Sequence, residues 1–369
     1  MRARAEESFR SLFATGTGTS PARQLLGTAI ALVAFLASCL GVGRLLDRVD
    51  GFWREEAGAA RIKARHVEER LDDYDVVFVG SSRVYRQLDP RVFDRVAREG
   101  GHEVRSYNLG LPGMRWYEAL HVVRDLIERR PARLDTIVVE GLDPDPRLEE
   151  HNRTSRREIG WHTPGLTTLA VRRSLGREGP LPERFEEAAA HLGQFGARWT
   201  NVGTAPDLLR ALQGKVRVPE DKELHGYVPL ELDPAASVLE RRRQFLEDYA
   251  ADRELLERRK DDLRAQGESA PDPLLFDVLA ELESAASDAG VRLSWLVLPP
   301  AEQLRPELSA AREAGRIEEL FDYADPDRYP QFYDSFQERW DLNHLTREAA
   351  TELTTLFARE FFAGWERGR

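Results

Sequence analysis

The sequence predicts an α/β fold, a three-layer sandwich with a mostly parallel sheet, preceded by one N-terminal transmembrane helix. From about residue 74, apolar runs of strand length alternate with helix-length segments, which is typical of a parallel sheet with helices on both faces. Between Arg23 and Arg44 lie 20 residues without a charge. A helix of that length crosses a hydrocarbon core of about 30 Å at about 1.5 Å per residue.

The N-terminal region is therefore divided into a cytoplasmic tail (1–23), a transmembrane signal anchor (24–46) and a helical stalk (47–73). The run Leu36-Ala37-Ser38-Cys39 also resembles a lipobox, so a lipoprotein anchored at Cys39 is the alternative. The long segment before the apolar run, and its continuation past Cys39, favour the uncleaved anchor. Arginines flank both ends of the run, so the positive-inside rule assigns no orientation.

Two groups of strands and helices are predicted within residues 74–369. The first group consists of Val76–Val79, Pro90–Arg98, Glu103–Tyr107, Tyr117–Arg129 and Thr136–Val139. The second begins with a helix over Leu274–Ala289, which Asp272 caps and Gly290 ends, and continues with a strand over Val291–Leu298. The strands are continuously apolar, as strands covered on both faces usually are.

The region between these groups, about 143–268, is predicted to be an irregular and helical insertion. Proline-rich loops lead into a long, heavily charged helix over Ser237–Gln266 with a narrow apolar stripe. We interpret this helix as solvated and packed along one seam, rather than as a coiled coil for a partner.

Composition excludes several classes of function. The net charge is −11 and the basic residues are interleaved with acids, which argues against a nucleic-acid surface. The single cysteine allows no intramolecular disulfide and no cysteine-based metal cage. His151, His162 and His225 show no metal-ligand spacing. We expect no metal and no organic cofactor.

The first predicted strand ends in Gly80-Ser81-Ser82, which raises the question of a nucleophilic serine. Taken alone, Ser82 is better explained as the cap of the following helix. A nucleophilic serine needs a base and a carboxylate that orients the base. Asp341 and His344 provide both, three residues apart and just before an amphipathic C-terminal helix. Ligands of parallel sheets bind beyond the carboxyl ends of the strands, where Ser82 is placed.

Donors for an oxyanion are predicted after the second strand, in "NLGLPG". A glycine at 110 lets a backbone N–H approach a ligand closely, so the amides of Ser82 and Gly110 are expected to form an oxyanion hole beside Asn108. Arg83 either binds an anionic substrate or forms a salt bridge. Glu140 is expected to line the pocket or to cap the next segment.

In this order, the three blocks resemble the SGNH/GDSL hydrolase superfamily, and in particular its membrane-anchored branch of D-alanyl-lipoteichoic acid transfer and alginate O-acetyltransferase-like proteins. The resemblance covers about 74–142 and 270–360, and implies Ser82 as nucleophile with Asp341 and His344 as its partners. One block departs from the family. Where an asparagine donor is usual, this chain has "VVEGLDPDPRLEEHN", with Glu140 and Asp143, and an ionised carboxylate cannot donate.

The resemblance implies an extracytoplasmic serine-dependent acyl-ester hydrolase or O-acyltransferase that acts on a cell-envelope glycan or polymer. A multi-pass membrane acyltransferase is an implied partner. The alternative is a catalytically silent envelope scaffold, which binds a polysaccharide or such an acyltransferase. The missing asparagine favours the scaffold, and the intact serine, aspartate and histidine favour the enzyme.

Overall fold

The structure is a computed structural model that describes residues 21–46, 59–149, 153, 155–200, 225–233, 235–265, 272–299, 305–334 and 336–365. The strands are β1 (Val76–Val79), β2 (Ser106–Asn108), β3 (Thr136–Glu140), β4 (Arg292–Val297) and β5 (Glu319–Asp322). Around them lie α3 (Ala59–Arg70), η2 (Leu71–Asp73), α4 (Ser82–Gln87), α5 (Pro90–Glu99), α6 (Trp116–Arg129), α13 (Pro273–Asp288), α14 (Arg305–Glu313), α15 (Gln331–Asp334), η5 (Phe336–Glu338) and α16 (Arg347–Trp365).

The five strands form one parallel sheet in the order β2-β1-β3-β4-β5. The chain leaves β1 toward β2 on one side and crosses back to β3 on the other, so the order reverses between β1 and β3. In open parallel sheets, such a reversal opens a crevice at the carboxyl ends of the two strands. Val79 ends β1 and Glu140 ends β3, so both termini lie at this point.

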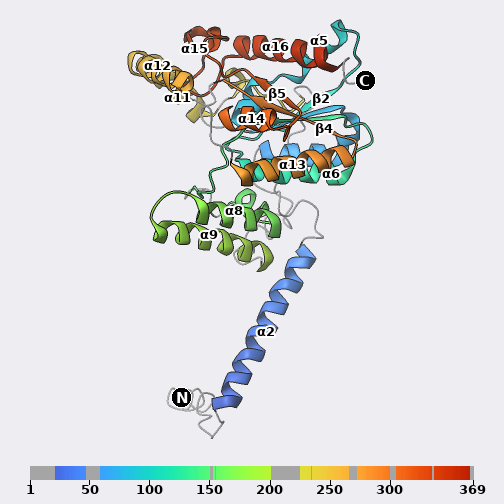
Figure 1. The fold of residues 1–369 in the computed structure, drawn as a ribbon, viewed down its shortest axis with the longest axis vertical. Coiled ribbons are helices and arrows are strands. Elements are labelled where there is room, and N and C mark those ends of the chain that lie inside the picture. Colours follow the sequence, from blue (N-terminus) through green and yellow to red (C-terminus); the bar gives the residue numbers. More distant parts are fainter. Residues whose placement is uncertain are drawn as a thin grey trace, which may run out of the picture.

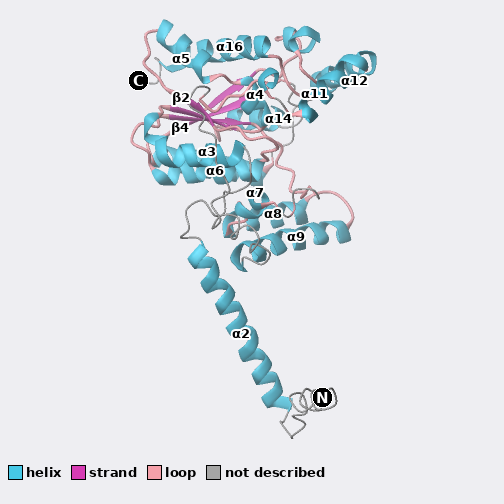
Figure 2. Ribbon diagram, turned by 180° about the vertical axis from the view of Figure 1, so that it is seen from behind, coloured by secondary structure: helices cyan, strands magenta, loops and turns pink. Residues whose placement is uncertain are grey.

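Helices cover both sides of the sheet, with α5 and α16 on one side and α3, α6 and α13 on the other (Figures 1 and 2). Alternate residues of β1 pack into different apolar clusters, because successive side chains of a strand point to opposite faces. Val77 and Val79 join the cluster under α6 and α13. Phe78 joins the other, where its ring lies 5.1 Å from that of Phe93. The α/β prediction is confirmed.

The described part of the region predicted as a stalk (47–73) packs on the domain and does not form a separate stalk. Val67 of α3 and Leu71 of η2 are buried in the cluster under α6, so from residue 59 onward this segment belongs to the folded domain. Residues 47–58 lie outside the described residues. Burial of these apolar side chains, which a free stalk would expose to water, explains the difference.

The insertion is more helical than predicted. It contains α7 (Arg156–Gly160), α8 (Pro164–Gly176), α9 (Leu181–Thr200), η4 (Leu230–Leu232), α11 (Ala236–Glu247) and α12 (Tyr249–Ala265). The single helix predicted over Ser237–Gln266 is two helices, α11 and α12. Asp248 ends the first, where its N–H donates to the Gln244 carbonyl, and its own carbonyl accepts the first bonds of the second.

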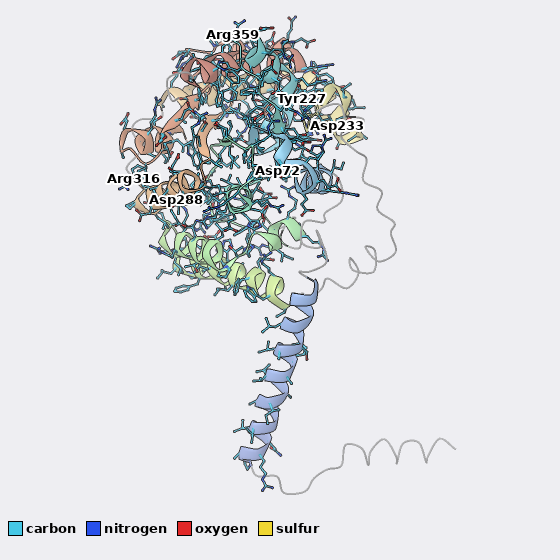
Figure 3. All side chains as sticks on the ribbon, turned by 90° about the vertical axis from the view of Figure 1, so that its right-hand side faces the viewer. Asp72, Tyr227, Asp233, Asp288, Arg316 and Arg359 are labelled. Carbon is cyan, nitrogen blue, oxygen red and sulfur yellow. The ribbon has the colours of Figure 1, made fainter. Side chains whose placement is uncertain are left out.

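Helix α2 (Pro21–Leu46) extends away from the domain, and Figure 3 shows its side chains projecting with no packed neighbours over most of its length. Its stretch Pro21–Gly41 has a mean hydropathy of 1.9 and is long and apolar enough to cross a membrane. The hydroxyls of Thr28 and Ser38 donate to carbonyls four residues earlier, which satisfies them without water.

Candidate active site

The turn after β1 is built around Gly80. A Cβ at this position would lie 2.5 Å from both Glu140 Oε2 and Val84 Cγ2, so only glycine fits. Ser81 is the N-cap of α4, and its Oγ accepts the N–H of Arg83 at 3.2 Å. Because Ser81 takes the capping role, the hydroxyl of Ser82 remains available for another partner.

That partner is His344. Ser82 Oγ lies 2.9 Å from His344 Nε2, across 262 residues of sequence. His344 Nδ1 in turn lies 2.9 Å and 3.1 Å from the two carboxylate oxygens of Asp341. A carboxylate opposite Nδ1 holds the proton on that nitrogen and leaves the Nε2 lone pair facing the hydroxyl. His344 and Asp341 are buried, whereas Ser82 is half-buried.

The local backbone explains the spacing of Asp341 and His344. Asp341 Oδ1 accepts the N–H groups of Asn343 and His344, at 2.8 Å and 2.9 Å, so the carboxylate folds the turn on which the imidazole stands. Burial alone would raise the pKa of Asp341. The hydrogen bond and charge of His344, the Asn343 N–H and the charge of Arg241 outweigh it and lower the pKa to about 2. The carboxylate is therefore ionised at neutral pH.

Two arginines from the insertion hold the same turn. Arg242 of α11 donates to the Trp340 carbonyl at 3.0 Å, and Arg259 of α12 donates to the Leu342 carbonyl at 2.8 Å. These contacts join residues more than eighty positions apart in the sequence, so no local pattern in the charged helices predicts them. The insertion thus packs against the Asp341–His344 turn.

Glu140 supports the other half of the site. Its buried carboxylate accepts the Ser81 N–H at 2.5 Å, the Ser81 hydroxyl at 3.1 Å and the Arg83 Nε–H at 2.7 Å. The sequence predicts that Arg83 either binds an anionic substrate or forms a salt bridge. In the structure it forms a salt bridge with Glu140, and 23% of its side chain is exposed. Where the resembled family has a donor to the substrate, this chain has an acceptor that braces the serine turn.

Asn108 is buried and its hydrogen-bonding groups are used within the protein. Its Nδ2 donates to the carbonyls of Val84 and Leu88, at 2.6 Å and 2.7 Å, and its Oδ1 accepts the Gly110 N–H at 2.9 Å. The expected pairing of the Gly110 amide with an oxyanion is therefore corrected, since this N–H already has an acceptor. Glycine at 110 has a steric reason, because a Cβ would lie 2.5 Å from Tyr85 N.

Lys63 is a site residue that sequence reasoning missed. It lies on α3, one turn before the buried Val67, and is itself 2% exposed. Its Nζ donates to the Gly110 carbonyl at 2.6 Å and to Asn108 Oδ1 at 3.2 Å. The same ammonium lies 4.1 Å from the centre of the Tyr85 ring. Its only sequence signal is the i, i+4 spacing to Val67, which does not distinguish it from a surface lysine.

The hydrogen bonds of the remaining candidates are to residues other than the serine. Asp143 Oδ1 accepts the Asp145 N–H at 3.1 Å, as in a loop cap, and burial together with the Asp145 charge raises the pKa of Asp143. His162 is buried against His191, with 3.1 Å between His162 Nε2 and His191 Nδ1. His151 lies outside the described residues. Within the described part of the chain, no group of His, Cys, Asp or Glu side chains is arranged to hold a metal ion.

No protein-family model matches this chain, and the comparisons with curated proteins and with solved structures found no match either. The resemblance to the SGNH/GDSL superfamily therefore depends on the motif residues, their order along the chain and the geometry described above.

Proposed function

We propose that the protein is a membrane-anchored, serine-dependent acyl-ester hydrolase or O-acyltransferase with a three-layer domain of the SGNH type. One observation carries the proposal: the continuous chain of contacts from Ser82 Oγ through the His344 ring to the Asp341 carboxylate. A half-buried hydroxyl beside a buried, oriented imidazole is the arrangement that nucleophilic catalysis at serine requires.

In this mechanism, Ser82 Oγ attacks the ester carbonyl while its proton passes to His344 Nε2. The new Oγ–C bond forms as the carbonyl electron pair moves onto oxygen. The tetrahedral intermediate then collapses, the ester C–O bond breaks, and the leaving alkoxide takes the proton from Nε2. Water gives hydrolysis of the acyl-serine, and an acceptor hydroxyl gives transfer. Asp341 stabilises the imidazolium throughout.

The oxyanion is the weak point of the site. Among the described residues, the Ser82 N–H has no hydrogen-bond acceptor, so it is available as one donor. The Gly110 N–H becomes a second donor only if it leaves Asn108 Oδ1. Loss of one oxyanion donor costs about 10²–10³ in rate. We therefore expect slow turnover of simple esters and faster reaction with an activated acyl donor.

Helix α2 is long and apolar enough to cross a membrane. We propose that it is a single-pass anchor, with the domain outside the cytoplasm and a cell-envelope glycan or polymer as substrate. A multi-pass acyltransferase as acyl supplier follows from the family resemblance alone. The mass of the mature N-terminus separates the uncleaved anchor from a lipoprotein cleaved and acylated at Cys39.

The test is covalent labelling of the full chain, in detergent, with a fluorophosphonate probe. The expected adduct is on Ser82, is lost in Ser82→Ala and His344→Ala, and is retained in Ser284→Ala. Ser284→Ala is the matched control, because it removes the hydroxyl of an exposed serine on α13, outside the serine turn. If the wild type forms no adduct while it remains folded, the enzyme proposal is wrong.

A second function has an observation in its favour. The Gly110 amide is bonded to Asn108, and Glu140 cannot donate to a substrate. Both features suit a silent scaffold that keeps the fold to bind a polysaccharide. This reading predicts no fluorophosphonate adduct and retention of the chain on a polysaccharide affinity matrix.

A further inference from the structure

Helix α9 carries an exposed apolar stripe. Leu181, Phe185 and Leu192 are 60%, 61% and 56% exposed, and their spacing of four and seven residues places them on one face of the helix. The buried Ala188 lies on the same face, between Phe185 and Leu192, and the buried His191 lies on the adjacent side. The stripe therefore borders the surface by which α9 packs on the domain. Large apolar side chains exposed in a row mark an interaction surface more often than scattered ones do.

The position of α9 identifies what covers this stripe. Helix α9 packs against α2, the helix that is long enough to cross a membrane. Figures 1 and 2 show α8 and α9 at the end of the domain from which α2 extends. If α2 crosses the bilayer, the elements that touch it at this end lie at the level of the lipid headgroups.

The composition of α9 suits the same environment. The exposed acidic residues Glu183 and Glu186 lie on the side of α9 away from the stripe, so the helix has no excess of basic charge that would attract it to an anionic surface. Phe195 and Trp199 lie at its C-terminal end, with their ring centres 5.7 Å apart. Aromatic rings of this kind are enriched at membrane interfaces. The attraction is therefore apolar and does not require anionic lipid.

We propose that α9 lies in the membrane interface, with Leu181, Phe185 and Leu192 inserted among the lipid chains. The protein is then attached to the bilayer by two helices, α2 across the membrane and α9 along its surface. This fixes the tilt of the domain, which a single spanning helix leaves free. His191 Nε2 contacts the Pro146 carbonyl at 2.8 Å, so α9 is joined directly to the loop that follows β3. The proposal depends on α2 spanning the membrane and not on the chemistry of Ser82.

The experiment is photo-crosslinking of the full chain in nanodiscs of phosphatidylcholine. Benzoylphenylalanine replaces Phe185 or Leu192, and, as a matched control, Leu239 of α11, which is 54% exposed on another part of the domain. All three positions are exposed, so the substitutions leave the core intact. After irradiation, mass spectrometry of the intact protein identifies each adduct.

The proposal expects phosphatidylcholine adducts at 185 and 192 and none above background at 239. The yield should be unchanged in about 1 M salt, where the Debye length is about 3 Å, because charge contributes nothing to the contact. Adducts at 185 or 192 to a second copy of the chain overturn the proposal and assign the stripe to a protein interface. Lipid adducts equal to those at 239 overturn it as well.

Discussion

Replacement of Glu140 by glutamine is the perturbation that most directly tests how the serine turn is held. Glu140 accepts three hydrogen bonds, two from Ser81 and one from Arg83. An amide has one acceptor oxygen and one donor group, so it cannot accept all three. Its best orientation keeps the Ser81 N–H on oxygen and donates to the Ser81 hydroxyl, which removes the charged acceptor of the Arg83 Nε–H.

The cost follows from these contacts. The Ser81 N–H exchanges a charged acceptor for a neutral one, which weakens the bond by about 1 kcal/mol. The lost ion pair adds about 1 kcal/mol or less, because Arg83 is 23% exposed and regains water. We expect the free energy of unfolding to fall by about 2 kcal/mol. A displacement of the Ser82 hydroxyl by about 1 Å would slow its reaction by up to about 10²-fold.

Two measurements on the full chain in detergent check this expectation. The unfolding temperature should fall by about 3 °C, at about 1.6 °C per kcal/mol for a domain of about 300 residues. Fluorophosphonate labelling of Ser82 should slow by about tenfold or more. The control is Glu283→Gln. Burial raises the pKa of Glu283 to about 7, so at neutral pH glutamine resembles a form that it already populates. If Glu140→Gln unfolds and labels like the wild type, Glu140 does not hold the turn.

Three further changes have defined outcomes. Gly110→Ala places a Cβ 2.5 Å from a backbone nitrogen and should lower the free energy of unfolding, measured by thermal unfolding, by about 1–3 kcal/mol. In Gly193→Ala the new Cβ has no atom within 4 Å, so the free energy of unfolding should not fall. Arg259→Ala removes the donor to the Leu342 carbonyl and should slow fluorophosphonate labelling of Ser82 with little change in unfolding temperature. Arg259→Lys should restore part of the labelling rate. An unchanged rate in Arg259→Ala would contradict a role for Arg259 in holding the Asp341–His344 turn. Burial lowers the pKa of His191 to about 4 in the folded protein. The unfolded protein therefore binds a proton at this side chain first, and the free energy of unfolding decreases by about 1.4 kcal/mol per pH unit as the pH falls from about 6.5 toward 4. The unfolding temperature of His191→Phe should therefore fall less than that of the wild type between pH 7 and pH 5, and an equal fall would refute a buried, neutral His191.

Local features of the chain were enough to predict much of this molecule. The uncharged run of α2, the continuous apolar strands and the capping signals of α13 depend on neighbouring residues, so pattern alone locates them. The spacing of Asp341 and His344 belongs to the same class, because the aspartate folds its own turn through bonds to residues two and three positions later. The charged helix over 237–266 was harder, since Asp248 interrupts it without a glycine or proline.

Only the tertiary structure decided which groups are already occupied. The sequence predicts Gly110 as an oxyanion donor, but in the structure Asn108 accepts its N–H. The sequence predicts Glu140 as a pocket or capping residue, and the structure shows that it accepts the Ser81 N–H. Lys63 and Arg259 reach the site from helices distant in sequence. A sequence shows which donors and acceptors exist, but a hydrogen bond joins atoms within about 3 Å. Which atoms approach that closely is determined by the packing of the helices on both sides of the sheet.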